Sequence, residues 1–381
     1  MKSAMSRRAR ETKPFRSPID NVAWPVKGEL RGSTTRWKKT MRILGLFQYP
    51  DHVCFRYRLQ AYRPYLEEAG HEVSFRGWPR WWLFENRFFQ ELEAADLVVV
   101  QRRLLSGWQL ERVRRAARAL AFDFDDAVFL RDSFDRRGPI SARRRQGFAR
   151  MVQAADVVVA GNAFLHDQAR EWTGRERVRL VPTCLNVKKY TAAAHSGRKP
   201  STHLAWIGSS STLRGLEKIG EWLDYVGRTI GGLNLKVICD RSLRLAYLPV
   251  RFCPWTQATE ARDLASADIG ISWLPPDAWS QGKCGLKILQ YMAAGLPVVA
   301  NPVGVQAELV RHGETGFLVN NAGEWQAAIR RLALDPCLRK RMGATARAQV
   351  KSEFHVTQGA AAWLELLKTL RRSQAAALPR A

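Results

Sequence analysis

The sequence lacks any close pairing of cysteines. Its cysteines are scattered, none belongs to a C-x-x-C pair, and the histidines form no cluster. Neither a disulfide framework nor a zinc site is therefore expected, and free thiols are typical of the cytosol. The cysteines are Cys54, Cys184, Cys239, Cys253, Cys284 and Cys337.

Long hydrophobic runs are also missing. No apolar stretch approaches the roughly 20 residues that a membrane-spanning helix needs, and the N-terminus lacks the apolar core of a signal peptide. The chain is therefore expected neither to span a membrane nor to be secreted, and a cytoplasmic location follows.

Acidic residues are scarce. Asp and Glu total 35 against 61 Lys and Arg, which gives a formal net charge of +26. Such a charge favours anionic partners: a phosphorylated substrate, an acidic membrane surface or nucleic acid. The sequence contains no recognised nucleic-acid-binding module, so no specific nucleic-acid partner is expected.

The organisation of the chain is that of an α/β protein. Short apolar runs such as 41–47, 97–101 and 298–300 alternate with helix-length segments, which predicts parallel sheets covered by helices. A small, polar stretch at 191–202 reads as a linker between two domains. The predicted units are a flexible basic extension (1–40), two Rossmann-like domains that face each other across a cleft (41–195 and 196–355), and a C-terminal helix and tail (356–381).

A helix with cations at its start is the first candidate site. Lys283, Lys287 and Gln290 are spaced i, i+4, i+7 and form one polar stripe, and Cys284 and Gly285 lie at the helix entrance. Cations are disfavoured at a helix N-terminus unless an anion binds there, so a diphosphate is expected to contact this segment. The alternative is a solvated helix face without a ligand.

A second candidate for anion binding follows the apolar run 203–207. Gly208, Ser209 and Ser210 allow a close approach of a phosphate to the backbone, and Arg214 lies in the next helical turn. The alternative is that the serines only cap the helix.

The first domain offers further polar residues after its predicted strands. Asp125 and Asp126 are expected to orient the acceptor hydroxyl or the donor sugar, and Arg56, Arg58 and Asn162 to contact the acceptor or a phosphate. Helix capping and simple surface charge are the respective alternatives. Asp123 and Asp125 form a D-x-D pair, which chelates divalent ions in other sites, but the lysine helix favours a metal-free site here.

The stretch 76–89 (RGWPRWWLFENRFF) mixes aromatic and basic residues. Trp81 and Trp82, with Arg80 and Arg87, predict contact with an anionic membrane surface, through which a lipid-linked acceptor would reach the cleft. Packing of these tryptophans in the core is an equal alternative.

Several of these motifs resemble one enzyme family. The segments LKILQYMAAGLPVVANPVG, ELVRHGETGFLV and MGATARAQV resemble the donor-binding half of family 4 of the retaining glycosyltransferases, and FDFDDA, VVVAGNAFL and WIGSSSTLR resemble a bacterial subgroup of it. The resemblance implies a GT-B fold, a nucleotide diphosphate-sugar donor and no metal cofactor. Gly282 and Gln290 occupy the places of the family's usual two glutamates.

The resemblance therefore predicts a glycosyltransferase (EC 2.4, hexosyl type) that moves a sugar to an acceptor hydroxyl with retention of configuration, in cell-surface polysaccharide or glycolipid assembly. The positions of Lys283, Lys287 and Arg214 suit stabilisation of the departing nucleotide diphosphate. Two alternatives remain, a sugar-nucleotide epimerase or hydrolase of the same fold and a basic nucleic-acid-binding protein.

Overall fold

The computed structural model describes residues 40–81, 85–195 and 201–377. The predicted basic extension therefore lies, apart from Thr40, outside the described residues, and so do Trp82 and part of the predicted linker.

The first domain is built on a six-stranded parallel sheet in the order β2-β1-β3-β4-β5-β6. Its central strands are buried along their whole length, because helices cover both faces. The strands are β1 (Arg42–Phe47), β2 (Glu72–Gly77), β3 (Leu97–Gln101), β4 (Leu120–Phe124), β5 (Val157–Ala160) and β6 (Val178–Leu180).

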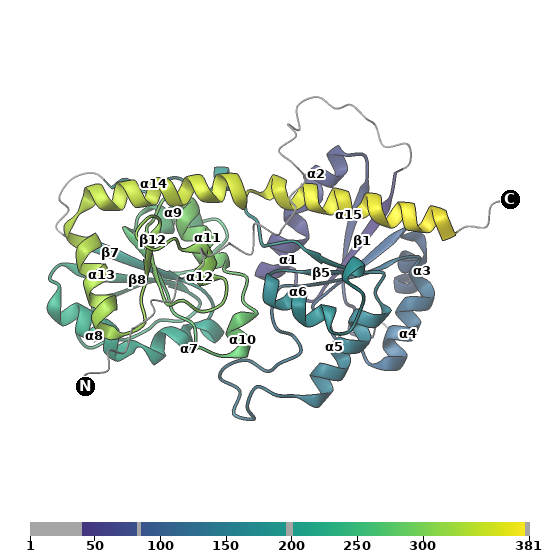
Figure 1. Ribbon diagram of the computed structural model, residues 1–381, viewed down its shortest axis with the longest axis horizontal. Helices are drawn as coiled ribbons and strands as arrows, with labels where there is room; N and C mark the ends of the chain where they lie inside the picture. Colours follow the sequence, from purple (N-terminus) through teal and green to yellow (C-terminus); the bar gives the residue numbers. More distant parts are fainter. Residues whose placement is uncertain (1–39, 82–84, 196–200, 378–381) are drawn as a thin grey trace, which may run out of the picture.

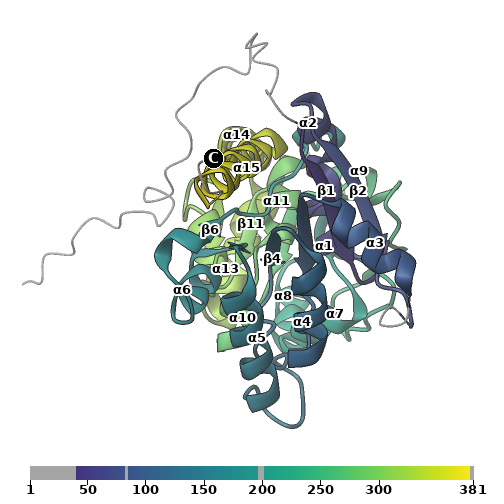
Figure 2. The ribbon, with the colours of Figure 1, turned by 90° about the vertical axis from the view of Figure 1, so that its right-hand side faces the viewer.

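The helices of the first domain form two layers. One layer holds α3 (Asn86–Ala94), α4 (Gly107–Ala116), α5 (Ala142–Ala154) and α6 (Ala163–Arg170), which share one apolar core with the sheet. The other layer holds α1 (Val53–Arg58), the short helix Gln60–Tyr62 and α2 (Arg63–Glu68). The helices lie on either side of the sheet in Figures 1 and 2.

The second domain repeats this plan with the strand order β12-β11-β10-β7-β8-β9, again all parallel. Its strands are β7 (Thr202–Ile207), β8 (Leu233–Cys239), β9 (Val250–Pro254), β10 (Ile269–Ser272), β11 (Val298–Ala300) and β12 (Gly316–Leu318). Its helices are α7 (Ser210–Lys218), α8 (Gly220–Thr229), α9 (Glu260–Ala265), α10 (Ala278–Gln281), α11 (Leu286–Ala293), α12 (Gln306–Leu309), α13 (Ala322–Leu334) and α14 (Pro336–Glu353). The prediction of two parallel-sheet domains is confirmed.

The last helix, α15 (Val356–Ala377), returns to the first domain. In Figure 1, α14 lies over the second domain and α15 continues across to the first. Trp363, Leu366 and Leu367 are buried in the same core as Ile43 and Tyr62. This helix therefore connects the two domains, on the side of the molecule opposite α10 and α5.

The aromatic stretch 76–89 divides between core and surface. Phe88 of α3 is buried in the core and the half-buried Trp78 packs against that core, whereas Trp81 is 69% exposed. Arg80 lies over the ring of Trp81, with 5.6 Å from its guanidinium carbon to the ring centre. Trp81 is thus a surface residue, as membrane contact requires, whereas Trp78 packs inward.

A glycine determines how closely α14 approaches α11, the helix that carries Lys287. A Cβ atom on Gly343 would lie 1.9 Å from the carbonyl oxygen of Gly295, just after α11. The two helices therefore pack with backbone against backbone, and any side chain at position 343 would force them apart.

We predict that Gly343→Ala destabilises the protein by about 1–3 kcal/mol, because overpacking outweighs the better helix propensity of alanine. Urea denaturation measures this change. Gly107→Ala is the matched control, since a Cβ there meets no atom within 4 Å, and it should stay within about 0.5 kcal/mol of wild type. Equal stability of the two variants would contradict the packing argument.

Candidate functional site

A cavity of about 410 Å³ lies between the two domains, where loops that follow the strands of both sheets meet. Its lining comes from the loops after β1, β4, β7 and β8 and from the start of α11. The predicted site residues that line it are Arg56, Asp125, Asp126, Gly208, Ser209, Lys283, Cys284, Gly285, Lys287 and Gln290.

The start of α11 is shaped by Gly285. This residue has a φ of +68°, and a Cβ there would lie 2.5 Å from the Cδ1 atom of Leu309. Only glycine combines the left-handed backbone with this close packing. The helix therefore begins at Leu286, and its first N–H groups and Lys287 are presented at the cavity.

Lys287 extends along the wall of the second domain. Its Nζ atom lies 4.3 Å from the ring centre of Trp206, a cation–π distance. Gly208 leaves space for it, because a Cβ there would come within 3.0 Å of the Cε atom of Lys287. Burial, with a smaller contribution from the charge of Lys283, lowers the pKa of Lys287 to about 7.

Lys283 binds a carboxylate of the opposite domain. Its Nζ atom lies 2.9 Å from Oδ1 of Asp126, and Arg102 contacts Oδ2 of the same carboxylate at 2.6 Å. Burial would raise the pKa of Asp126, but Lys283 and Arg102 outweigh it and lower the pKa below its ordinary value. Asp126 is therefore ionised and shared between two cations.

Asp125 has hydrogen-bonding capacity to spare. Its Oδ1 atom lies 3.3 Å from a guanidinium nitrogen of Arg102, yet it is buried without a hydrogen bond in the described structure. The main-chain carbonyl of Asp125 accepts a bond from the thiol of Cys284 at 3.2 Å. The carboxylate thus lines the cavity and can accept bonds from a hydroxyl-bearing ligand.

Gln290 and Arg56 line the cavity within a hydrogen-bond network between the domains. Gln290 Nε2 donates to the hydroxyls of Tyr57 and Tyr190, both at 3.3 Å. Glu260 accepts bonds from Arg56 and Tyr57, each at 3.0 Å. Burial and the nearby Glu260 charge raise the pKa of Tyr57 to about 12, so this hydroxyl remains a donor.

The expected phosphate contact of Arg58 is wrong. Its side chain is fully buried, lies 2.5 Å from Oδ1 of Asp123 and also donates to the carbonyl of Val181. Arg58 therefore neutralises a buried carboxylate beneath the cavity. The same pair occupies Asp123, so the D-x-D motif cannot present two carboxylates to one metal ion in this structure.

Asn162 does not reach the cavity as an acceptor contact. Its side-chain amide donates to the carbonyls of Gln281 and Lys283, at 2.9 and 3.0 Å, and its oxygen caps α6 through the N–H of Leu165. All its hydrogen-bonding groups are thus used in bracing the segment before α11 against the first domain. The expected ligand contact is replaced by this structural role.

Ser210 and Arg214 also lie outside the cavity lining. The N–H of Ser210 donates to Asp240 at 2.6 Å, so a carboxylate already occupies this helix start. Arg214 donates to the carbonyl of Phe134 at 3.2 Å and lies over its ring. Arg214 therefore joins the two domains, and the predicted donor contacts of these two residues are not supported by their placement.

Gly282 occupies the place of one of the two glutamates of the resembled family, and it packs directly against the first domain. A Cβ on Gly282 would lie 2.7 Å from both the nitrogen and the Cβ atom of Ala127, directly after Asp126. No side chain fits there. The carboxylates nearest to Lys283 therefore come from the first domain, through Asp125 and Asp126.

Other residues of the site were not predicted. His52, Asp240, Trp255 and Glu260 line the cavity, and Arg102 holds both aspartates with a φ of +57°, which is rare for a residue other than glycine. Asp240 directly follows β8, so the rule that identified Asp125 would also have found it. No sequence pattern identified Glu260, because its contact with Arg56 forms only when the two domains pack together.

Among residues 40–81, 85–195 and 201–377, no group of three or more His, Cys, Asp or Glu side chains could hold a metal ion. In the same part of the chain, no helix is both long and apolar enough to cross a membrane.

A family model matches the part of the chain that bears the lysines. Residues 229–335 match the model described as Glycosyl transferases group 1. This segment is therefore similar to a group 1 glycosyltransferase domain. Lys283, Lys287 and Gln290 all lie within the matched residues.

A curated protein is similar to this chain over a longer stretch than the family model. The chain is 44% identical over 243 residues to D-inositol 3-phosphate glycosyltransferase of Pseudarthrobacter chlorophenolicus, a match of 55% of this chain and 56% of that protein. The chain thus spans little more than half of that relative's length.

Solved structures match over most of the chain. Sucrose-phosphate synthase from Thermosynechococcus elongatus has a TM-score of 0.68 and 17% identity, over 88% of this chain and 100% of that one. HepE of Anabaena, in complex with UDP and glucose, has a TM-score of 0.65 and 16% identity, over 86% and 100%. The fold is GT-B, and the segment that matches the group 1 model lies in its second domain.

The placement of Lys287 predicts that this residue lowers the stability of the protein. We expect Lys287→Met to be more stable than wild type by about 1–3 kcal/mol near pH 6.5, because wild type must then bury a charge. The folded pKa is about 7 and that of an unfolded lysine about 10.4. Raising the pH between these values deprotonates the folded state first, so wild type gains stability and the difference should shrink towards pH 9.5.

Urea denaturation at the two pH values measures this effect. Lys218→Met, which removes an exposed lysine from the end of α7, is the matched control and should change little at either pH. A stability difference for Lys287→Met that is the same at both pH values would rule out the titration of Lys287.

Proposed function

We propose that the protein is a retaining glycosyltransferase of family 4 that transfers a hexose from a nucleotide diphosphate-sugar to an acceptor hydroxyl. The observation that carries the proposal is the meeting of Lys283, Lys287 and the N-terminus of α11 at the interdomain cavity. The group 1 domain match and the nucleotide-bound HepE structure support the same donor class.

The diphosphate of the donor would lie at the start of α11. There it accepts hydrogen bonds from the first N–H groups of the helix and from the two ammonium groups. When the bond between the sugar carbon and the phosphate oxygen breaks, negative charge grows on the leaving diphosphate. The same cations then bind it more strongly than in the ground state, which lowers the barrier.

Lys283 forms an ion pair with Asp126. A diphosphate that takes over Lys283 would leave Asp126 with Arg102, close to Asp125. We assign to these two carboxylates the binding of sugar or acceptor hydroxyls, since Gly282 leaves no room for a carboxylate from the second domain.

The proposed donor site needs no metal, because two lysines and a helix N-terminus supply the positive charge. The proposed acceptors are sugars or lipid-linked sugars of cell-surface polysaccharide or glycolipid assembly, reached in the cytoplasm at the inner face of the membrane. The net charge of +26 and the exposed Trp81 support contact with an anionic membrane.

A panel of nucleotide sugars tests the donor assignment. A true donor at about 100 times its dissociation constant should stabilise the protein by about 2.7 kcal/mol, which appears as a rise in melting temperature. Product mass with the best donor then separates transfer from the alternatives, since a hydrolase releases free sugar and an epimerase returns an isomer of the donor. Activity that disappears with a chelator would contradict the metal-free site.

The lysines are tested separately by Lys283→Ala and Lys287→Ala. Each should weaken binding of the nucleoside diphosphate by roughly 10–100-fold, because a hydrogen bond to a charged group contributes about 1.5–3 kcal/mol. Isothermal titration measures the affinities, with Lys218→Ala as the exposed control. Unchanged affinity in both variants would remove the diphosphate from this site.

A further inference from the structure

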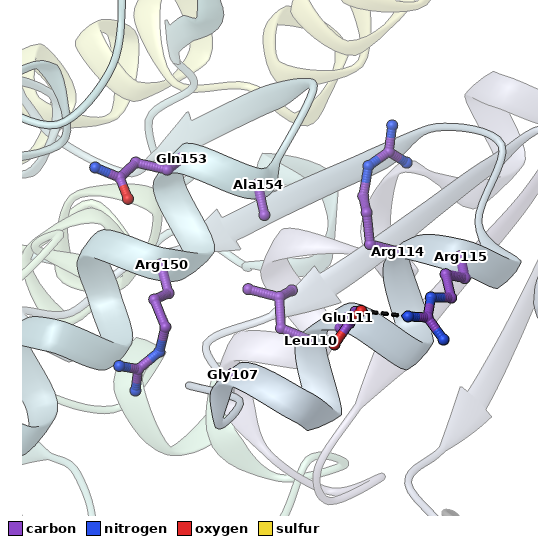
Figure 3. A pocket seen from close by; sticks show the side chains of 8 residues that line it. All are labelled: Gly107, Leu110, Glu111, Arg114, Arg115, Arg150, Gln153 and Ala154. Atoms are coloured by element: carbon purple, nitrogen blue, oxygen red, sulfur yellow. Dashed lines mark hydrogen bonds and ion pairs between the residues drawn. The ribbon is translucent and has the colours of Figure 1, made fainter.

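The outer surface of the first domain carries an unusual charge pattern on two neighbouring helices. Figure 2 shows α4 and α5 side by side, turned away from the second domain. An open groove of about 490 Å³ runs between them (Figure 3), lined by Arg114 and Arg115 from α4 and Arg150 from α5. The residues that line the groove are distant in sequence from Lys283 and Lys287, and none of them lines the interdomain cavity.

The two helices contain seven arginines and one acidic residue, Glu111. That glutamate is paired with Arg115, and the nearby Asp156 is paired with Arg114. Residues 136–155 contain six arginines and no acidic residue. The exposed arginines that dominate this surface are Arg112, Arg115, Arg143, Arg144 and Arg145.

Exposed apolar side chains lie at one end of this basic surface. Trp81, Trp108 and Ile140 are 69%, 55% and 77% exposed. They belong to the segments that follow β2, β3 and β4, so all three lie towards the carboxyl edge of the first sheet. The interdomain cavity opens at the same edge. Large exposed apolar residues beside a basic surface are typical of an interaction site.

We propose that these side chains form one docking surface for an anionic lipid bilayer. We call it the α4–α5 face, and define it by the exposed arginines named above with Trp81, Trp108 and Ile140. The arginines bind lipid phosphates, and the three apolar side chains enter the headgroup region. This inference deepens the proposed function, because it brings the cavity to the membrane that holds a lipid-linked acceptor.

The arrangement favours a bilayer over nucleic acid. Trp108 lies in the first turn of α4, on the same helix as Arg112 and Arg115. Ile140 lies just before α5, so the apolar side chains adjoin the arginines. A bilayer interface binds both kinds of group, because apolar side chains enter the headgroup region while guanidinium groups bind the lipid phosphates. Nucleic acid binding through phosphate contacts would use only the arginines and would leave the exposed Trp81, Trp108 and Ile140 without a partner.

Vesicle sedimentation with the full chain tests the proposal without donor or acceptor. Wild type should bind vesicles of phosphatidylethanolamine and phosphatidylglycerol (3:1) and bind phosphatidylcholine vesicles at least about tenfold more weakly. The variant R112Q/R115Q/R143Q should lose at least about tenfold in binding to the anionic vesicles. Its control, R330Q/K340Q/R341Q, removes three exposed charges from α13 and α14 and should bind like wild type.

A second variant tests the apolar part of the face. Trp108→Ser should lower binding to the anionic vesicles by roughly fivefold, with the salt dependence of binding unchanged. Tyr247→Ser removes an exposed aromatic ring from the second domain and serves as its control. Stabilisation by nucleotide sugars, measured without vesicles, should be the same in all these variants, so failure of the docking surface is distinguishable from failure of the donor site.

Two outcomes would overturn the inference. Equal vesicle binding by R112Q/R115Q/R143Q and R330Q/K340Q/R341Q would show that attraction depends on total charge or on other segments and not on this face. Loss of binding to a short DNA duplex by the first variant, with vesicle binding intact, would assign the face to nucleic acid.

Discussion

The site depends on charged contacts that cross between the two domains. Asp126 of the first domain lies between Arg102 of its own domain and Lys283 of the second, and Gly282 packs directly on Ala127. These contacts bring two lysines and two carboxylates to one cavity. Without them, each domain would present half of a site to water, where isolated surface charges contribute little to binding.

Lys283 and Lys287 differ in their surroundings, and this difference affects how each would bind an anion. Lys283 is neutralised by Asp126, whereas burial against Trp206 lowers the pKa of Lys287 to about 7. An anionic ligand would compensate both, by replacing Asp126 at Lys283 and by favouring the protonated form of Lys287. Binding of a diphosphate would therefore offset the unfavourable burial of Lys287, which is how a binding site gains affinity at the expense of stability.

The first domain combines two surfaces with different tasks. Its carboxyl-edge loops supply Asp125 and Asp126 to the cavity, and the same edge carries the exposed Trp81, Trp108 and Ile140. A parallel sheet makes this combination natural, since every loop that follows a strand emerges at one edge. In the proposed arrangement, an acceptor held in a bilayer would reach the carboxylates from that edge while the second domain holds the donor.

The sequence by itself determined the two parallel sheets, the helix that carries Lys287 and Gln290, and the carboxylates after β4, because buried strands and helix starts leave local patterns in the chain. The order along the chain also placed these residues at strand ends, which face the cleft in this fold. The predicted helical stripe is wrong for Lys283, which lies before the start of α11. Only the tertiary structure determined that Arg58, Asn162 and Arg214 contact buried or interdomain partners. Likewise, Glu260 and Arg102 gain their roles from partners distant in the chain. Local sequence records exposure and spacing, but not which opposite charge folding will bring near.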